Sequence, residues 1–206
     1  FRPNFGLIKQ IYGIGIPSII MASIGSVMNY GMNRILLGFT STAAAVFGVY
    51  FKLQSFIFMP VFGLNNGVIP VIAYNYGAGN KDRVVKAIKS SALIAIIIMT
   101  AGVIAFQTIP DVLLKMFDAS ETMLFIGVPA LRVISLSFIF AAVGIACSSA
   151  FQALGYAFYS MLMSIVRQLV VILPVAYLLS LTGEVRLVWF AFPIAEVVAI
   201  ILCAFF

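Results

Sequence analysis

A single carboxylate inside an apolar stretch is the residue of this chain best suited to chemistry. Glu196 lies in the run 186–206, whose other charged residue, Arg186, stands at its start. Burial favours the neutral carboxyl and a nearby cation favours the carboxylate, so a group balanced between them can load and release a proton or hold a cation. The alternative is a static ion pair with Arg167 or Lys52 that fixes the last apolar segment.

Three basic residues lie similarly deep in apolar stretches. Lys52 and Arg132, like Glu196, are about ten residues from one end of their segment, and Arg167 is about ten from the opposite end. At ~1.5 Å per residue this depth is roughly 15 Å, near the middle of a ~30 Å hydrocarbon core. A charge there costs at least ~2.5–3.5 kcal/mol, so we expect these side chains to face the bundle interior or a wet cavity. Arg34 lies near a segment end and can snorkel.

Uncharged amides extend the set of candidate residues. Asn29 and Asn33 are four apart and share one helix face. Gln54, Asn65 and Asn66 lie in the second apolar stretch, and Gln168 lies in the fifth. The predicted coupling-ion or substrate-cavity residues are therefore Glu196, Arg167, Gln168, Lys52, Arg132, Asn33, Gln54 and Asn66.

Signatures of enzymatic chemistry are missing from the sequence. There is no histidine, no phosphate-binding loop and no Ser/His set, and the two cysteines, Cys147 and Cys203, lie inside apolar stretches as small fillers. We expect a protein that is not an enzyme, with no catalytic residue, no metal site and no cofactor other than H⁺ or Na⁺ as a coupling ion.

Six apolar stretches carry these residues. They run over about 11–37, 43–74, 84–106, 122–149, 157–180 and 186–206, and most reach the ~20 residues that a helix needs to cross a membrane. Hydrophobic residues make up 64% of the chain, charged residues 9%, and the mean hydropathy is +1.18. A soluble domain could not cover so much apolar surface. The sequence predicts an all-α polytopic membrane protein whose residues 1–206 form a single lobe of six transmembrane helices in the lipid bilayer.

The charged residues between the stretches predict the orientation. The formal net charge is +6. One side carries mainly basic residues, namely Arg2, Lys9, Lys81, Arg83, Lys86 and Lys89. The other carries Lys115 and Arg186 mixed with Asp111, Asp118, Glu121 and Glu184. Because basic residues mark the cytoplasmic side, we expect a multi-pass plasma-membrane protein with a cytoplasmic N-terminus, and no nucleic-acid partner.

The breaks between stretches are short, so neighbouring helices should be antiparallel and adjacent. Asn80 follows a glycine-rich turn and is expected to cap the next helix. Asp118 precedes Glu121 by three residues, the spacing of a capping box. Ala142, Ala146 and Ala150 recur every four positions and predict close helix packing. Prolines within the stretches permit bends; they are Pro17, Pro60, Pro70, Pro129, Pro174 and Pro193.

Several stretches, in this order and spacing, resemble one transporter family. They are Gly15-Ile16-Pro17, Asn33-Arg34, Phe56-Ile57-Phe58-Met59-Pro60, Tyr74-Asn75-Tyr76-Gly77-Ala78-Gly79-Asn80, Phe151-Gln152-Ala153-Leu154-Gly155, Arg167-Gln168, and Trp189 through Glu196. Over its full length the chain resembles the C-terminal half of a MATE (multidrug and toxic compound extrusion) transporter, in the bacterial branch with DinF-like and MepA-like proteins. Its start at Phe1 without Met and its end at Phe206 in an apolar run agree with half of a longer protein.

The resemblance implies a twelve-helix transporter with two six-helix lobes, of which the N-terminal lobe is absent here and would be the partner. It implies a secondary active efflux system that exports small cationic, amphipathic, drug-like molecules by antiport with H⁺ or Na⁺. Sodium-coupled relatives of the NorM type carry acids on the first and fourth helices of this lobe. Here the first stretch has none and the core of the fourth has only Arg132 as a charge, which argues against a NorM-like sodium site.

Two other functions fit the residues. A flippase for lipid-linked precursors, built on a related fold, would use a strongly cationic cavity, and the excess of Lys52, Arg132 and Arg167 over Glu196 favours that reading. A membrane assembly subunit would need no transport site at all.

Overall fold

The computed structural model describes residues 5–205, and every regular element in that range is a helix. The elements are α1 (Phe5–Leu37), α2 (Ser41–Gly77), α3 (Lys81–Thr108), α4 (Pro110–Lys115), α5 (Glu121–Ser135), α6 (Phe138–Ala153), α7 (Ala157–Ile165), the π-helix η1 (Val166–Ile172), α8 (Leu173–Ser180), α9 (Val185–Val188) and α10 (Ala191–Phe205). Within that range five helical stretches are long and apolar enough to cross a membrane, and α5 with α6 makes a sixth when the bent pair is one span. The prediction of an all-α polytopic protein is confirmed.

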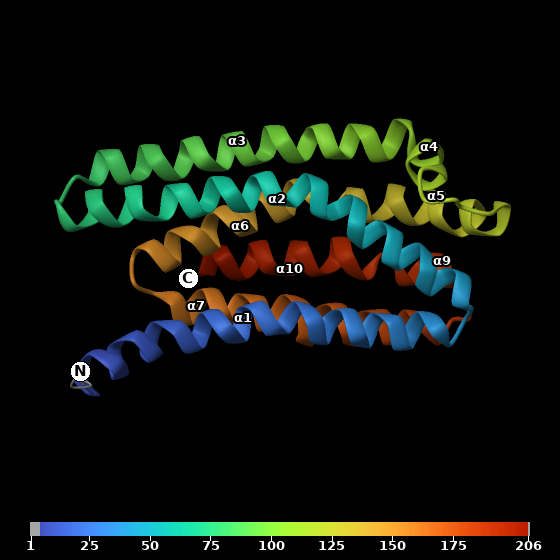
Figure 1. The fold of residues 1–206 in the computed structure, drawn as a ribbon, viewed down its shortest axis with the longest axis horizontal. Coiled ribbons are helices and arrows are strands. Elements are labelled where there is room, and N and C mark those ends of the chain that lie inside the picture. Colours follow the sequence, from blue (N-terminus) through green and yellow to red (C-terminus); the bar gives the residue numbers. More distant parts are fainter. Residues whose placement is uncertain (1–4, 206) are drawn as a thin grey trace.

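The long helices lie side by side and run up and down the molecule (Figure 1). The turns at 78–80 and 154–156 lie at one end of the lobe, called here the basic end because α3 begins there with Lys81, Arg83, Lys86 and Lys89. The connections 38–40, 109–120 and 181–184 lie at the opposite, mixed-charge end. Arg2, which was predicted on the basic side, lies outside the described residues. In Figure 1, α10 runs between the layer of α1 and α7 and the layer of α2 and α3.

An aromatic cluster anchors the start of α10 against α2. The Trp189 side chain is fully buried, and its ring centroid lies 6.4 Å from that of Phe47. One turn further on in both helices, Tyr50 meets Phe192 edge-on at 5.8 Å. Such aromatic pairs add about 0.5–1.5 kcal/mol beyond the area they bury. Because Glu196 comes four residues after Phe192, this cluster sets the height and rotation of the carboxylate in the lobe.

The fourth predicted stretch is a bent pair rather than one straight helix. The axes of α5 and α6 meet at 47°. No proline lies at the bend; instead, the Ser135 and Ser137 hydroxyls donate to the carbonyls of Arg132 and Ile134, at 2.9 and 2.6 Å. Gln107 of α3 also donates to the Arg132 carbonyl, at 2.8 Å. Side-chain donors that take carbonyls of the helix ladder are a recognised cause of bends.

Two of the predicted helix caps differ from the structure. Asn80 occupies the position before α3, but its side chain makes no capping hydrogen bond. The capping box of Asp118 with Glu121 is wrong, because the Ser120 hydroxyl accepts from the Met123 amide at 3.3 Å and so caps α5. Asp118 instead adopts a φ of 56° in the preceding turn, a backbone conformation that Asp tolerates better than most residues.

Small residues on α6 and α3 lie where these helices pack against their neighbours. Ala142 and Ala146 are buried along α6, and Ala150 is half-buried, in agreement with the predicted packing face. On α3, a Cβ added to Gly102 would lie 2.7 Å from Cγ2 of Ile57 in α2. The closeness of α2 to α3 therefore depends on the absence of a side chain at residue 102.

We expect Gly102→Ala to destabilise the lobe by about 1–3 kcal/mol, because the β-branched Ile57 has little freedom to move away from the added methyl group. The matched control is Gly67→Ala in α2, where an added Cβ meets nothing within 4 Å. Apparent melting temperatures in detergent should fall for the first variant only. Equal melting temperatures for the two variants would contradict close packing of α2 on α3.

Candidate functional site

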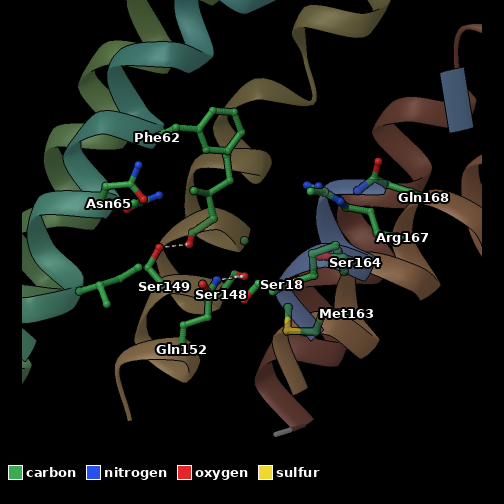
Figure 2. Close-up of a pocket in the computed structure, with 17 residues that line it drawn as sticks. Ser18, Phe62, Asn65, Ser148, Ser149, Gln152, Met163, Ser164, Arg167 and Gln168 are labelled. Atoms are coloured by element: carbon green, nitrogen blue, oxygen red, sulfur yellow. Dashed lines mark hydrogen bonds between the residues drawn. The ribbon is translucent and has the colours of Figure 1, made fainter. Parts of the chain in front are cut away.

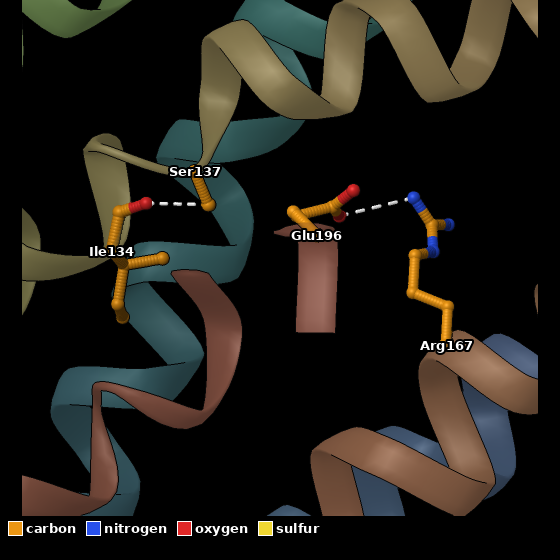
Figure 3. Close-up of polar contacts among 4 residues, drawn as sticks. All are labelled: Ile134, Ser137, Arg167 and Glu196. Carbon is orange, nitrogen blue, oxygen red and sulfur yellow. Dashed lines mark hydrogen bonds and ion pairs between the residues drawn. The ribbon is translucent and has the colours of Figure 1, made fainter. Parts of the chain in front are cut away.

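A buried ion pair joins the π-helix to the last helix. Nη1 of Arg167, in η1, lies 3.1 Å from Oε1 of Glu196, in α10 (Figure 3). The Glu196 side chain is 11% exposed and the Arg167 side chain 24% exposed, so the carboxylate is the more deeply enclosed partner. Of the two cations proposed as partners for Glu196, the structure selects Arg167.

Local backbone structure brings the two charges together. Arg167 is the second residue of a π-helix, in which each turn holds more residues than an α turn and side chains point in altered directions. Pro174 follows closely and has no N–H to continue the hydrogen-bond ladder. On α6, Gly144 lies beside Glu196: a Cβ at residue 144 would be 3.9 Å from Oε2. Oε2 itself is buried and has no hydrogen-bond partner.

Two adjoining cavities meet at the ion pair. The polar compartment, of about 390 Å³, is lined by Ser18, Met21, Ala22, Phe62, Asn65, Asn66, Ile69, Gly144, Ile145, Ser148, Ser149, Gln152, Met163, Ser164, Arg167, Gln168 and Ala199. The aromatic compartment, of about 360 Å³, is lined by Gly25, Met28, Phe51, Gln54, Ser55, Phe58, Met59, Phe62, Ile145, Arg167, Gln168, Ile172, Phe192 and Glu196. Arg167 and Gln168 are among the residues that line both compartments.

The polar compartment lies toward the basic end and is rich in hydrogen-bonding groups. The hydroxyls of Ser148 and Ser160 form a hydrogen bond between α6 and α7. Gln152 donates to both of them, at 3.4 and 3.2 Å. Asn65 projects from α2 on the side of the cavity opposite Arg167 (Figure 2). Its side chain is buried, yet neither amide atom has a hydrogen-bond partner.

The aromatic compartment has a different chemistry. Phe51, Phe58 and Phe62 of α2 and Phe192 of α10 supply ring surfaces, and Glu196 supplies a carboxylate. Methionines 28 and 59 add flexible, polarisable surface. Aromatic faces and a carboxylate together suit an organic cation, because the ring quadrupoles and the negative charge of the carboxylate both attract it.

Five of the predicted candidates lie at these cavities. Arg167 and Gln168 line both compartments, Glu196 and Gln54 line the aromatic compartment, and Asn66 lines the polar compartment. Three other candidates line neither of these two cavities; they are Lys52, Arg132 and Asn33.

Lys52 and Arg132 lie away from the two cavities for different reasons. Lys52 is exposed, and its ammonium lies 5.8 Å from the centroid of the Phe117 ring, in the connection at the mixed-charge end. Long side chains on a helix lean toward its N-terminus, which for α2 is that end. Arg132 is exposed, and its carbonyl accepts from Gln107 in the last turn of α3. α5 extends past the end of α3 (Figure 1), so a residue ten positions into the predicted stretch lies level only with the last turn of α3.

Asn33 is held by a neighbour on its own helix. Its Nδ2 donates to the carbonyl oxygen of Asn29 at 2.9 Å and to Oδ1 of Asn29 at 2.7 Å. The shared face of these two amides was predicted from their spacing, and the structure shows that they pair with each other.

Sequence reasoning missed the serine cluster of α6 and α7 and Gln152, and it noted Asn65 as an amide of the second stretch without placing it in the candidate set. Their signal is the group Ser148-Ser149 followed by Gln152 in an otherwise apolar helix, and the adjacency of Asn65 to Asn66. The π-helix at Arg167 has no sequence signal of its own.

These features define a multi-pass membrane protein with a charged, partly polar cavity inside its helix bundle. The MatE family model matches residues 17–178. The chain therefore belongs to the MatE family, whose members are transporters.

Curated relatives agree with this assignment. The chain is 30% identical over 209 residues to the multidrug export protein MepA of Staphylococcus haemolyticus, covering 99% of this chain and 45% of that protein. It is 28% identical over 189 residues to MepA of Staphylococcus aureus strain MRSA252, covering 91% and 42%. The chain thus spans less than half the length of the curated relatives it matches, which agrees with a second lobe in those proteins.

Solved structures share the fold. A MOP superfamily transporter from Pyrococcus furiosus superposes with a TM-score of 0.90 at 24% identity, covering 98% of this chain and 46% of that one. An outward-facing multidrug resistance MATE family transporter superposes with a TM-score of 0.89 at 24% identity, covering 98% and 46%. The six-helix bundle is therefore one lobe of a MATE-type twelve-helix architecture.

We expect Arg167→Gln to destabilise the protein by about 3 kcal/mol or more, because it leaves the Glu196 carboxylate buried without its counter-charge. The double variant Arg167→Gln with Glu196→Gln should recover most of that loss. The matched control is Arg132→Gln, since Arg132 is exposed and lines neither cavity. Apparent melting temperatures of the four proteins form the test, and additive losses in the double variant would contradict the pairing.

Proposed function

We propose that this chain forms part of a secondary active multidrug efflux transporter that exports cationic, amphipathic compounds by antiport with H⁺ or Na⁺. One observation carries the proposal: a buried carboxylate, with one oxygen paired and the other unpaired, stands at the junction of two cavities. The curated relatives named above are multidrug export proteins, and their function is extended here to this chain.

Glu196 is the group proposed to couple the ion to the substrate. When the carboxylate is charged, it attracts Arg167 and any organic cation in the aromatic compartment. When it takes up a proton, or holds Na⁺ through Oε2, its attraction for both is cancelled. Competition between the coupling ion and the drug for one carboxylate is sufficient for exchange, because each can then bind only after the other has left.

The lobe carries the means to change shape around that site. Proline interrupts the hydrogen-bond ladder at residues 17, 60, 70 and 174, and serine side chains bend the α5–α6 pair. In the proposed transporter this lobe rocks against an N-terminal lobe, and the cavity opens alternately to each side of the membrane. The basic end is proposed to face the cytoplasm and the membrane is proposed to be the plasma membrane.

The lining of the cavities favours drug efflux over a lipid-linked precursor flippase. A flippase would use a strongly cationic cavity to hold a diphosphate, but Lys52 and Arg132 line neither compartment. Arg167 is then the single basic residue among the lining residues, and it is paired with Glu196.

We expect Glu196→Gln to slow efflux of a cationic dye by about ten-fold or more, because the amide cannot exchange a proton or attract a cation. Folding should persist, since the glutamine oxygen still accepts a hydrogen bond from Arg167. The assay is dye efflux from proteoliposomes that hold the full-length protein, driven by an imposed proton gradient or an imposed sodium gradient.

The matched control is Glu184→Gln, because Glu184 is exposed and precedes α9 at the mixed-charge end. This control should transport at the rate of the unmodified protein. Unchanged kinetics in Glu196→Gln would remove Glu196 from the mechanism. If neither the imposed proton gradient nor the imposed sodium gradient drives efflux, the proposed antiport is overturned.

A further inference from the structure

We propose that the outer face of α3 at the basic end is a binding site for an anionic phospholipid. The headgroup would lie against Lys86 and Lys89, and the acyl chains would lie along the apolar part of the same helix face. This site is on the outside of the lobe, so it does not depend on the transport function proposed above. It depends on α3 crossing the membrane and on where its charges lie along the span.

One exposed stripe runs along α3 from basic residues to apolar ones. Lys86 and Lys89 are exposed. Leu93, Ile97 and Ile104 follow them and are 59%, 61% and 58% exposed. Because residues three or four positions apart share a face of an α-helix, these five side chains form one continuous strip. A molecule with a charged head and an apolar tail matches the strip from end to end.

The stripe faces away from the two cavities. Among the described residues that line the polar and aromatic compartments, none belongs to α3. Figure 1 shows α3 at the outer edge of the lobe, beyond α2. The opposite face of α3 carries Gly102, which packs against Ile57 of α2. A second lobe that shared the cavities would approach from their side of α2, so the stripe is left to lipid.

The uncharged length of α3 places the two lysines at the membrane surface. Residues 90–108 carry no charged side chain, and at about 1.5 Å per residue they span about 28 Å, close to the ~30 Å of a hydrocarbon core. Lys89 then lies at the boundary, and Lys86 lies about 4.5 Å further out, at the level of the headgroups. Tyr74 and Tyr76 are exposed at the same end of α2, and tyrosine is enriched at this level of the membrane.

The basic residues of α3 lack a counter-charge from the protein. This helix carries one acidic residue, Asp82, against four basic ones, Lys81, Arg83, Lys86 and Lys89. None of these five forms an ion pair with another described residue. An anionic headgroup supplies the missing negative charge, whereas a zwitterionic headgroup brings no net charge. Charge complementarity therefore favours an anionic phospholipid over the other lipids of a bilayer.

The test uses phosphatidylglycerol with a photoreactive diazirine in one acyl chain. The full-length protein is irradiated with this lipid in phosphatidylcholine nanodiscs, and labelled residues are located by peptide mass spectrometry. We expect label on α3 between Leu93 and Ile104, displaced by unlabelled phosphatidylglycerol and not by added phosphatidylcholine. Equal displacement by the two lipids would overturn the proposal. So would a lack of label on α3, the result expected if another protein segment covers the stripe.

The decisive variant combines Lys86→Gln with Lys89→Gln. Its matched control combines Lys115→Gln with Arg186→Gln, which removes two exposed cations from the mixed-charge end and changes the net charge equally. Each lysine at an anionic surface contributes a factor of about five, so labelling of α3 at low lipid concentration should fall about 25-fold in the first variant only. Lys86→Arg with Lys89→Arg keeps both charges and should retain the label. Unchanged labelling in the first variant, or an equal fall in the control, would overturn the proposal.

Glycerophosphoglycerol separates a lipid site from a site for a free anion. This molecule carries the same phosphodiester headgroup without acyl chains. We expect a large excess of it to leave the labelling of α3 unchanged, because contact with the apolar part of the stripe contributes to lipid binding. Displacement by the headgroup alone would show a free-anion site and overturn the lipid site.

Discussion

The architecture of this lobe depends on burying one ion pair in an apolar bundle. The Glu196 carboxylate is the more enclosed of the two charges, and leaving it without its counter-charge would be costly, because the packed side chains around it do not replace its hydration. Arg167 and Glu196 come from different helices, η1 and α10, so these helices must pack at a height and rotation that bring the two groups within 3.1 Å. The aromatic cluster of Trp189 and Phe192 with α2 fixes α10, and the absence of a side chain at Gly144 leaves room for the carboxylate.

The two cavities follow from how the helices around the pair deviate from ideal geometry. The α5–α6 bend arises where serine hydroxyls and Gln107 take carbonyls that the helix ladder would otherwise use. Beyond the bend, α6 presents Ser148 and Gln152 toward α7, and their hydrogen bonds with Ser160 close the polar compartment at the basic end. The two compartments share Arg167 and Gln168, and they differ in that the polar one is lined by Ser148 and Gln152 and the aromatic one by Phe51, Phe58 and Phe192.

Sequence alone predicted the all-α membrane fold and the importance of Glu196 and Arg167, because length and hydropathy define spans and a charge in such a span needs a partner. It did not place Lys52 and Arg132, which are exposed and line neither cavity, because residue counting gives a position along one helix but neither the direction of the side chain nor how far that helix extends past its neighbours. It also left Asn65 out of the candidate set. An amide in a membrane helix has a partner in most proteins, and only the packed structure shows that this one lacks it.

The π-helix that contains Arg167 is a segment whose backbone could change its helical twist. A π turn holds about one residue more than an α turn, so tightening Val166–Ile172 into α geometry would swing the residues on one side of it by about 100° relative to those on the other. Such a swing would carry the guanidinium away from α10, while each N–H of the segment exchanged its π-helical partner for the carbonyl four residues back. Because η1 is continuous with α7 and α8, uncoupling the charges in this way would turn one of these two helices about its own axis.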